Sequence, residues 1–111
     1  PGDAWAYGPN IDWLGRIVEA VRGKSLGQVF RERIFAPLDM QDIGFEMTPS
    51  MRARLAVVHQ RAADGTLTAV PDLVLPQPPV MDMGGHGLYA TMGEYMKFIR
   101  MILNNGDGPH G

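Results

Sequence analysis

The chain has 111 residues, a length typical of one small domain, and 45% of them are apolar. The formal net charge is −2, and Lys and Arg alternate with acidic residues, which argues against the clustered basic face of a nucleic-acid-binding protein. The chain has no Cys, which excludes disulfides and thiol catalysis. No apolar run approaches the roughly 20 residues that a membrane-spanning helix needs.

The first predicted helix runs from about Asn10 to Arg22. Asn10 is a favourable N-cap residue, and Gly23 suits the left-handed position that ends a helix. Gly15 lowers helix propensity, so it marks a close contact with another element. The apolar residues that recur on one face at helical spacing are Ile11, Leu14, Ile17, Val18 and Val21.

The second predicted helix begins at Ser25, which forms a capping box with Gln28. It ends at Pro37, because the residue before a proline is pushed out of the helical region. Its expected inner stripe consists of Leu26, Val29, Phe30 and Ile34.

The third predicted helix follows Thr91, where Thr91 and Glu94 repeat the capping pattern. Gly106 is expected to close this helix in the left-handed conformation. The residues at core spacing are Tyr95, Phe98, Ile99, Ile102 and Leu103.

The middle of the chain predicts strands and a loop. The segment "RLAVVHQRAADGTLTAVP" indicates two short strands around the turn pair Asp64-Gly65. The following "PDLVLPQPPVMDMGGHG" contains four prolines, which prevent a regular ladder or helix there. Long irregular loops in compact domains are uncommon, and they are more often functional or disordered than decorative. These elements together predict a mainly α structure with a short β-hairpin.

Few residues indicate chemistry on their own. The three His lack metal-ligand spacing, so no metal site is expected, and neither Ser lies in a nucleophile motif. Taken alone, Tyr7 beside Trp5 is a packing aromatic. His86, between glycines, is either a pocket residue or a solvated loop residue.

Two ordered blocks carry a resemblance to a known family. "PGDAWAYG", "RGKS" and "IFAPLDMQDIGF" are similar to a pattern "PG..W.YS", a helix ending "G.S", and "I..PLGM.DT.F". "GGHGLYATMGEYMKFIRMILNNG" is similar to "GGGGL.ST..D...F...LLNGG". The chain therefore resembles the serine β-lactamase and penicillin-binding-protein superfamily, with class C β-lactamases and family VIII esterases as the nearest branches.

The resemblance implies an α+β fold, of which this chain would supply much of the helical domain. It also implies a site made of Ser-x-x-Lys, a Tyr-containing motif and a Lys-Thr-Gly-like strand motif. Tyr7 matches the motif tyrosine, which takes up the serine proton and passes it to the leaving group. A free phenol has a pKa of about 10, so such a base requires a nearby ammonium.

Neither Ser-x-x-Lys nor Lys-Thr-Gly occurs in residues 1–111. We therefore expect a single segment, 1–111, from the middle of a longer serine hydrolase domain, inactive by itself. The chain opens on Pro1 and not Met, which fits a missing N-terminal part.

The motif departs from the lactamase form in one respect. Where lactamases have Tyr-x-Asn, this chain has Pro9, and Asn10 follows one residue later. The spacing from Tyr7 to the "LG" of the helix is the shorter one of the esterase branch, which favours ester over β-lactam hydrolysis. The resemblance makes His86 and the displaced Asn10 candidates for substrate binding. β-Lactamase or D-alanyl-D-alanine peptidase activity, and a non-catalytic helical binding module, remain alternatives.

The partners implied are a small ester or amide substrate and the remaining parts of the same hydrolase. No cofactor, metal, nucleic acid or membrane segment is expected. Apolar helix faces that would meet the missing sheet should be exposed, and such patches favour self-association of the segment.

Overall fold

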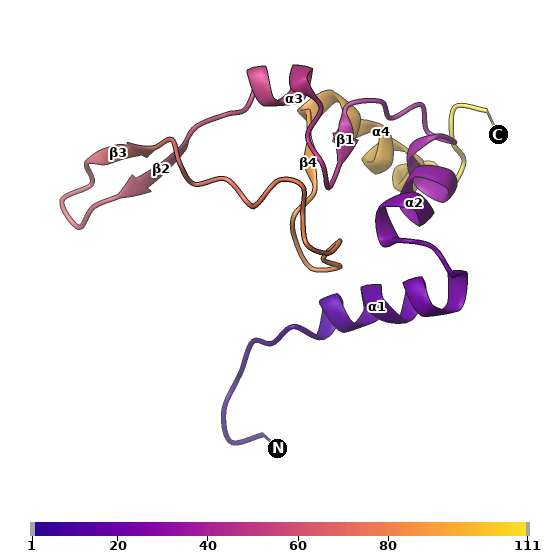
Figure 1. The fold of residues 1–111 in the computed structure, drawn as a ribbon, viewed down its shortest axis with the longest axis horizontal. Coiled ribbons are helices and arrows are strands. Elements are labelled where there is room, and N and C mark those ends of the chain that lie inside the picture. The colour runs from indigo at the N-terminus through magenta and orange to yellow at the C-terminus, as the bar shows by residue number, and fades with distance from the viewer. Residues whose placement is uncertain (1, 111) are drawn as a thin grey trace.

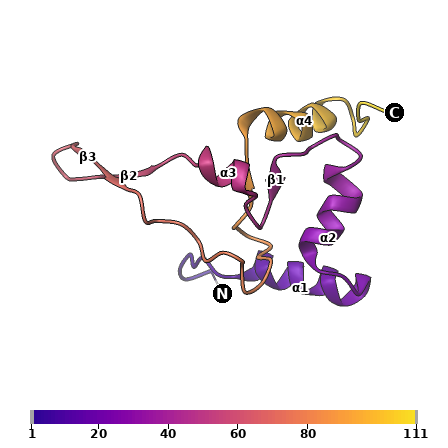
Figure 2. The ribbon, with the colours of Figure 1, turned by 45° about the horizontal axis from the view of Figure 1, so that its top comes forward.

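The computed structural model describes residues 2–110. Three helices, α1, α2 and α4, surround a small pair of strands, and a hairpin extends away from them (Figures 1 and 2). The elements in chain order are α1 (Asn10–Arg22), α2 (Leu26–Phe30), the π-helical turn η1 (Arg31–Phe35), β1 (Ile43–Gly44), α3 (Pro49–Ala53), β2 (Val58–Arg61), β3 (Leu67–Val70), β4 (Tyr89–Ala90) and α4 (Met92–Leu103).

Helix α1 has the predicted bounds, and Gly23 ends it in the left-handed conformation, with its N–H donating to the carbonyl of Glu19 at 2.8 Å. The predicted N-cap is wrong. Pro9 holds the cap position, and Asn10 is already helical, with no side-chain cap bond. The Trp13 N–H donates to the Pro9 carbonyl at 3.1 Å, so the first helical bond starts one residue earlier than expected.

Helix α2 begins as predicted, with both bonds of the capping box present. The Gln28 N–H donates to Ser25 Oγ at 3.3 Å, and the Ser25 N–H donates to Gln28 Oε1 at 3.2 Å. This reciprocal pair satisfies two of the amide groups that a helix start leaves without partners.

The prediction of a regular helix from Ser25 to Pro37 is wrong in its second half. In η1 the Ala36 N–H donates to the carbonyl of Arg31 at 2.9 Å, five residues back. The wider turn moves Phe35 onto the inner face, where it is 5% exposed and meets the Phe30 ring edge-on at a centroid distance of 5.9 Å. Ile34, expected on the inner stripe, is only partly buried.

Helix α4 begins at Thr91, whose side chain accepts from the Glu94 N–H at 3.3 Å. Glu94 does not return the bond, so the predicted capping box is only half formed. Its carboxylate instead accepts from the Gln41 N–H at 2.9 Å and from Lys97 at 3.0 Å. At the other end Gly106 has φ 101°, as predicted.

Two antiparallel strand pairs are present in the described part of the chain. β1 pairs with β4 through Ile43↔Ala90 and Gly44↔Tyr89, and this pair joins the two halves of the sequence. The predicted hairpin is confirmed as β2–β3. Its loop is longer than the two-residue turn expected, because Ala62 bonds to Thr66 and Gly65 holds the left-handed position.

The apolar core lies among α2, η1 and the segment around β1, with Phe98 and Met101 of α4 packed against it. Helix α1, in contrast, buries only Gly15. The expectation of exposed apolar helix faces is confirmed. The exposed apolar residues of α1 and α4 are Ile11, Trp13, Leu14, Ile17, Val21, Met92, Tyr95, Met96, Ile102 and Leu103.

Candidate active site

Tyr7 and His86 line one hollow of about 480 Å³ beside the start of α1. The loop before β4 passes the first turn of α1 (Figure 2), and residues of both segments line the hollow. The Tyr7 side chain is 83% exposed, and its ring lies 6.1 Å from that of Trp5 at an angle of 37°. Tyr7 and His86 are distant in the sequence, so the fold brings them together. The remaining residues that line the hollow are Gly8, Pro9, Ile11, Asp12 and Gly85.

A close backbone crossing lies next to this hollow. Gly84 lies against α1 so tightly that a Cβ atom there would be 2.2 Å from the Ile11 carbonyl oxygen. A Cβ on Gly15 would in turn be 3.2 Å from the backbone nitrogen of Gly84. The close contact predicted from Gly15 is confirmed, and its partner is the glycine-rich loop that carries His86.

Asp12 links the loop to the helix. The Gly85 N–H donates to Asp12 Oδ1 at 2.8 Å, and His86 Nδ1 lies 3.9 Å from the same oxygen. Sequence reasoning missed Asp12. An acidic residue in the first turn of a helix is already explained by the helix dipole, so nothing in the sequence pointed to the distant loop.

Asn10 is not among the residues that line the hollow. Its side-chain oxygen lies near Gly8 instead, 3.7 Å from where a Cβ on that glycine would stand. The structure thus places Tyr7 and His86 together, and Asn10 beside them on the first turn of α1. A substrate contact by Asn10 stays a prediction.

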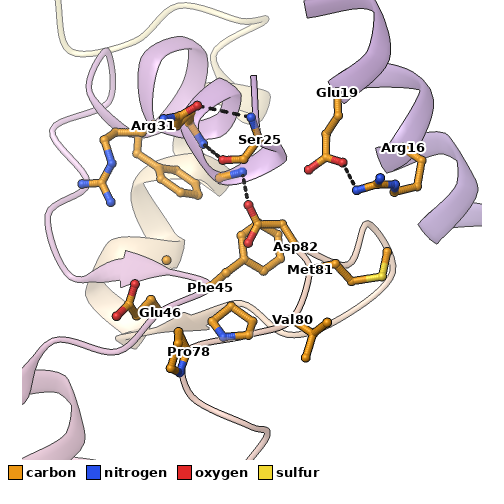
Figure 3. Close-up of a pocket in the computed structure, with 15 residues that line it drawn as sticks. Arg16, Glu19, Ser25, Arg31, Phe45, Glu46, Pro78, Val80, Met81 and Asp82 are labelled. Carbon is orange, nitrogen blue, oxygen red and sulfur yellow. Dashed lines mark hydrogen bonds and ion pairs between the residues drawn. The ribbon is translucent and has the colours of Figure 1, made fainter. Parts of the chain in front are cut away.

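A second cavity of about 470 Å³ lies between α1, α2, β1 and the proline-rich segment (Figure 3). Two of its three acidic groups have partners: Asp82 Oδ2 accepts from the Gly27 N–H at 2.8 Å, and Glu19 accepts from the Leu26 N–H and pairs with Arg16. These carboxylates hold the start of α2 in place. The positions of Asp82 and Glu19 are therefore explained by structure without a ligand.

Two carboxyl groups have lowered pKa values, and both lie away from the hollow. A hydrogen bond from Lys24 lowers the pKa of Glu32, and the backbone N–H of Thr66 lowers the pKa of Asp64. Among residues 2–110, no three His, Asp or Glu side chains are grouped as metal ligands. In the same part of the chain, no helix has the length and apolar character to cross a membrane.

The family model of the beta-lactamases matches residues 1–110. The chain belongs to the beta-lactamase family. This confirms the resemblance seen in the two sequence blocks. The chain is 37% identical over 106 residues to monacolin J acid methylbutanoyltransferase of Aspergillus terreus, a match that covers 93% of this chain and 26% of the relative. It is 34% identical over 111 residues to lovastatin esterase of Penicillium rubens, covering 95% of this chain and 27% of the esterase.

Solved structures of this beta-lactamase family agree with the fold. A mutant of simvastatin synthase from Aspergillus terreus superposes with a TM-score of 0.85 at 35% identity, covering 95% of this chain and 27% of the synthase. The chain spans about a quarter of the length of the relatives it matches. The fold is therefore that of a part of a beta-lactamase-like protein; its assignment to the helical domain stays a prediction.

Proposed function

We propose that residues 1–111 are one segment of a longer serine hydrolase that forms an acyl-enzyme on small esters, most nearly a carboxylesterase. The observation that carries this proposal is the shared hollow of Tyr7 and His86 in a chain of the beta-lactamase family. The names of two relatives support the reaction class, since one is an esterase and the other transfers an acyl group.

Tyr7 would act as the general base in this reaction. As a phenolate, its oxygen would accept the proton of the attacking serine, and the phenol formed would then donate that proton to the leaving alcohol. The side chain is exposed and lies at the edge of the hollow, so it is accessible to groups from elsewhere in the longer protein. His86, in the loop before β4, would contact the bound substrate.

The serine nucleophile and its lysine would come from outside residues 1–111. The two serines of this chain have structural partners: Ser25 caps α2, and the Ser50 hydroxyl accepts from Arg54 at 3.2 Å. This supports a site assembled from several segments of the longer protein. The segment alone is then expected to be inactive.

Acyl transfer to an alcohol is the second candidate, and the 37% identical methylbutanoyltransferase favours it. Both reactions use the same acyl-enzyme and differ in whether water or an alcohol removes the acyl group. β-Lactam or peptide hydrolysis is a weaker alternative, supported by 33% identity to penicillin-binding protein 4 of Amycolatopsis lactamdurans. Pro9 argues against it, because proline offers no side-chain amide to a β-lactam.

The test uses the longer protein with a short-chain nitrophenyl ester and a chromogenic cephalosporin. Tyr7→Phe removes the hydroxyl and keeps the ring, so kcat for the ester should fall about 10²- to 10⁴-fold. Tyr95→Phe, a tyrosine of α4 outside the hollow, is the matched control and should leave kcat unchanged.

Unchanged ester turnover in Tyr7→Phe would show that Tyr7 is not the base. Cephalosporin hydrolysis as fast as ester hydrolysis would overturn the esterase preference. Mass spectrometry of the protein after brief exposure to the ester should show one added acyl group. No adduct and no turnover would instead support the non-catalytic binding module.

A further inference from the structure

Asp12 is the one side chain of α1 that bonds to the loop carrying His86. Its Oδ1 atom accepts from the Gly85 N–H at 2.8 Å, and the His86 Nδ1 lies 3.9 Å away. The latter distance is too long for a hydrogen bond but within the range of an electrostatic contact. The Asp12 side chain is only 16% exposed, whereas that of His86 is 54% exposed. The carboxylate is therefore enclosed by the loop, and the imidazole stays accessible.

The loop has little freedom to bring His86 to the hollow in any other way. Gly84 is pressed against the Ile11 carbonyl, and a Cβ on Gly85 would stand 3.1 Å from Asp12 Oδ1. The crossing thus fixes the backbone before His86, and the Asp12 bond fixes the next amide. With Nδ1 on the side of Asp12, the Nε2 atom is the ring nitrogen left for a ligand.

We propose that Asp12 is a positioning residue for substrate binding: it holds the Gly84–His86 loop on α1 and so presents the His86 imidazole to the hollow shared with Tyr7. This inference rests on the proposed function, because it takes the hollow as the substrate site. Asp12 touches no reacting atom. It acts through His86, and its loss should weaken substrate binding more than it slows the chemical step.

Asp82 offers a matched comparison within the same chain. It too accepts a glycine N–H at 2.8 Å, that of Gly27, and it too links the proline-rich segment to a helix. It lines the cavity of Figure 3 and not the hollow of Tyr7 and His86. If loosening the proline-rich segment raised KM in a general way, Asp82→Ala and Asp12→Ala should raise KM equally.

The experiment measures kcat and KM for the nitrophenyl ester in the longer protein. Asp12→Ala should raise KM about tenfold with kcat within about twofold, the size of effect expected from losing one bond to a charged acceptor. Asp12→Asn keeps an oxygen that accepts from Gly85, so its KM should stay within about threefold of the original. Asp82→Ala should leave KM within about twofold.

A double substitution separates positioning from a plain structural role. If Asp12 acts through His86, His86→Ala should raise KM as Asp12→Ala does, and the double variant should show no further rise. Two independent, multiplying effects would overturn the proposal. So would an unchanged KM in Asp12→Ala, or an equal rise in Asp82→Ala.

Hydrogen exchange distinguishes failure of this inference from failure of the proposed function. In the same longer protein, the Gly85 amide should exchange faster in Asp12→Ala and at the original rate in Asp12→Asn. Unchanged exchange in Asp12→Ala overturns the positioning role even if the ester is hydrolysed. A protein that hydrolyses no ester but shows the faster exchange refutes the proposed reaction and the substrate role of His86, and leaves only the attachment of the loop.

Discussion

Nine apolar side chains between Leu26 and Met51 are 8% exposed or less, whereas α1 buries only Gly15. The first region is held by contacts among Phe35, Leu38 and their neighbours. Helix α1 is held by a backbone crossing at Gly84 and by two carboxylates, which accept from the Gly85 amide of the loop and from the Leu26 amide at the start of α2. The apolar side chains of α1 contribute little to its attachment.

The difference in burial shows which apolar surfaces are covered within this segment and which are left exposed to a partner. The core of the region from Leu26 to Met51 is completed within the segment, by Phe98 and Met101 of α4. The apolar face of α1 is well suited to packing against the rest of a longer hydrolase, or against a second copy of the segment. Self-association stays a prediction, and so does the single-segment organisation of residues 1–111.

The largest loss of stability should come from a substitution in the apolar core. Phe35→Ala removes a ring that is 5% exposed and packed on Phe30, so the free energy of unfolding should fall by about 3–5 kcal/mol. Urea denaturation of the 111-residue chain measures it. Val21→Ala is the control on α1, where the side chain is 78% exposed, and should change stability by about 0.5 kcal/mol or less. Equal losses would erase the contrast between the two regions.

A smaller loss of stability is expected from a substitution where the Gly84 backbone crosses α1. Gly84→Ala places a Cβ against the Ile11 carbonyl, and the shift that this requires should cost about 1–3 kcal/mol. Gly93→Ala, in α4, has its nearest contact at 4.0 Å and should instead stabilise the chain by about 0.5–1 kcal/mol. Thermal unfolding of both variants checks the pair. A neutral Gly84→Ala would show that backbone contact does not hold α1.

The smallest change in stability should come from the ion pair of Lys24 and Glu32, because both side chains are exposed to solvent. Lys24 lowers the pKa of Glu32 below the ordinary 4.5, so the carboxylate stabilises the folded chain above that pH. The contribution is lost as the pH falls through the lowered pKa. Unfolding curves of Glu32→Gln and the original chain should differ slightly at pH 7 and converge as the pH falls through the lowered pKa of Glu32. A difference that grows in acid would contradict this sign.

The elements with local signals were predictable from the sequence. The bounds of α1, the capping box at Ser25 and the hairpin at Gly65 are set by residues close in the chain. The π-helical turn was not, because it depends on which of Ile34 and Phe35 packs better in the assembled core. The cap at Asn10 failed for a similar reason: its side chain favours a cap, but the Pro9 carbonyl already accepts the first helical bond.

The candidate site was predictable only in part. Tyr7 and His86 came from motif resemblance, and the hollow that they share depends on a crossing between distant segments. Gly15 predicted a close contact on α1, but the sequence did not indicate which segment makes that contact. The sequence did not indicate the role of Asp12, because its hydrogen bond with Gly85 joins two residues that are far apart in the chain.

The π-helical turn also has a consequence for chain length. A hydrogen bond to the fifth residue back contains one residue more than an α-helical bond, so this turn holds one residue that a regular helix would not. Deleting one residue between Arg31 and Ile34 would remove the wide turn and give a regular helix, and the following Leu38 and Met40 would keep their places in the core. This turn is therefore the place in the helix where the chain can lose a residue without displacing the core.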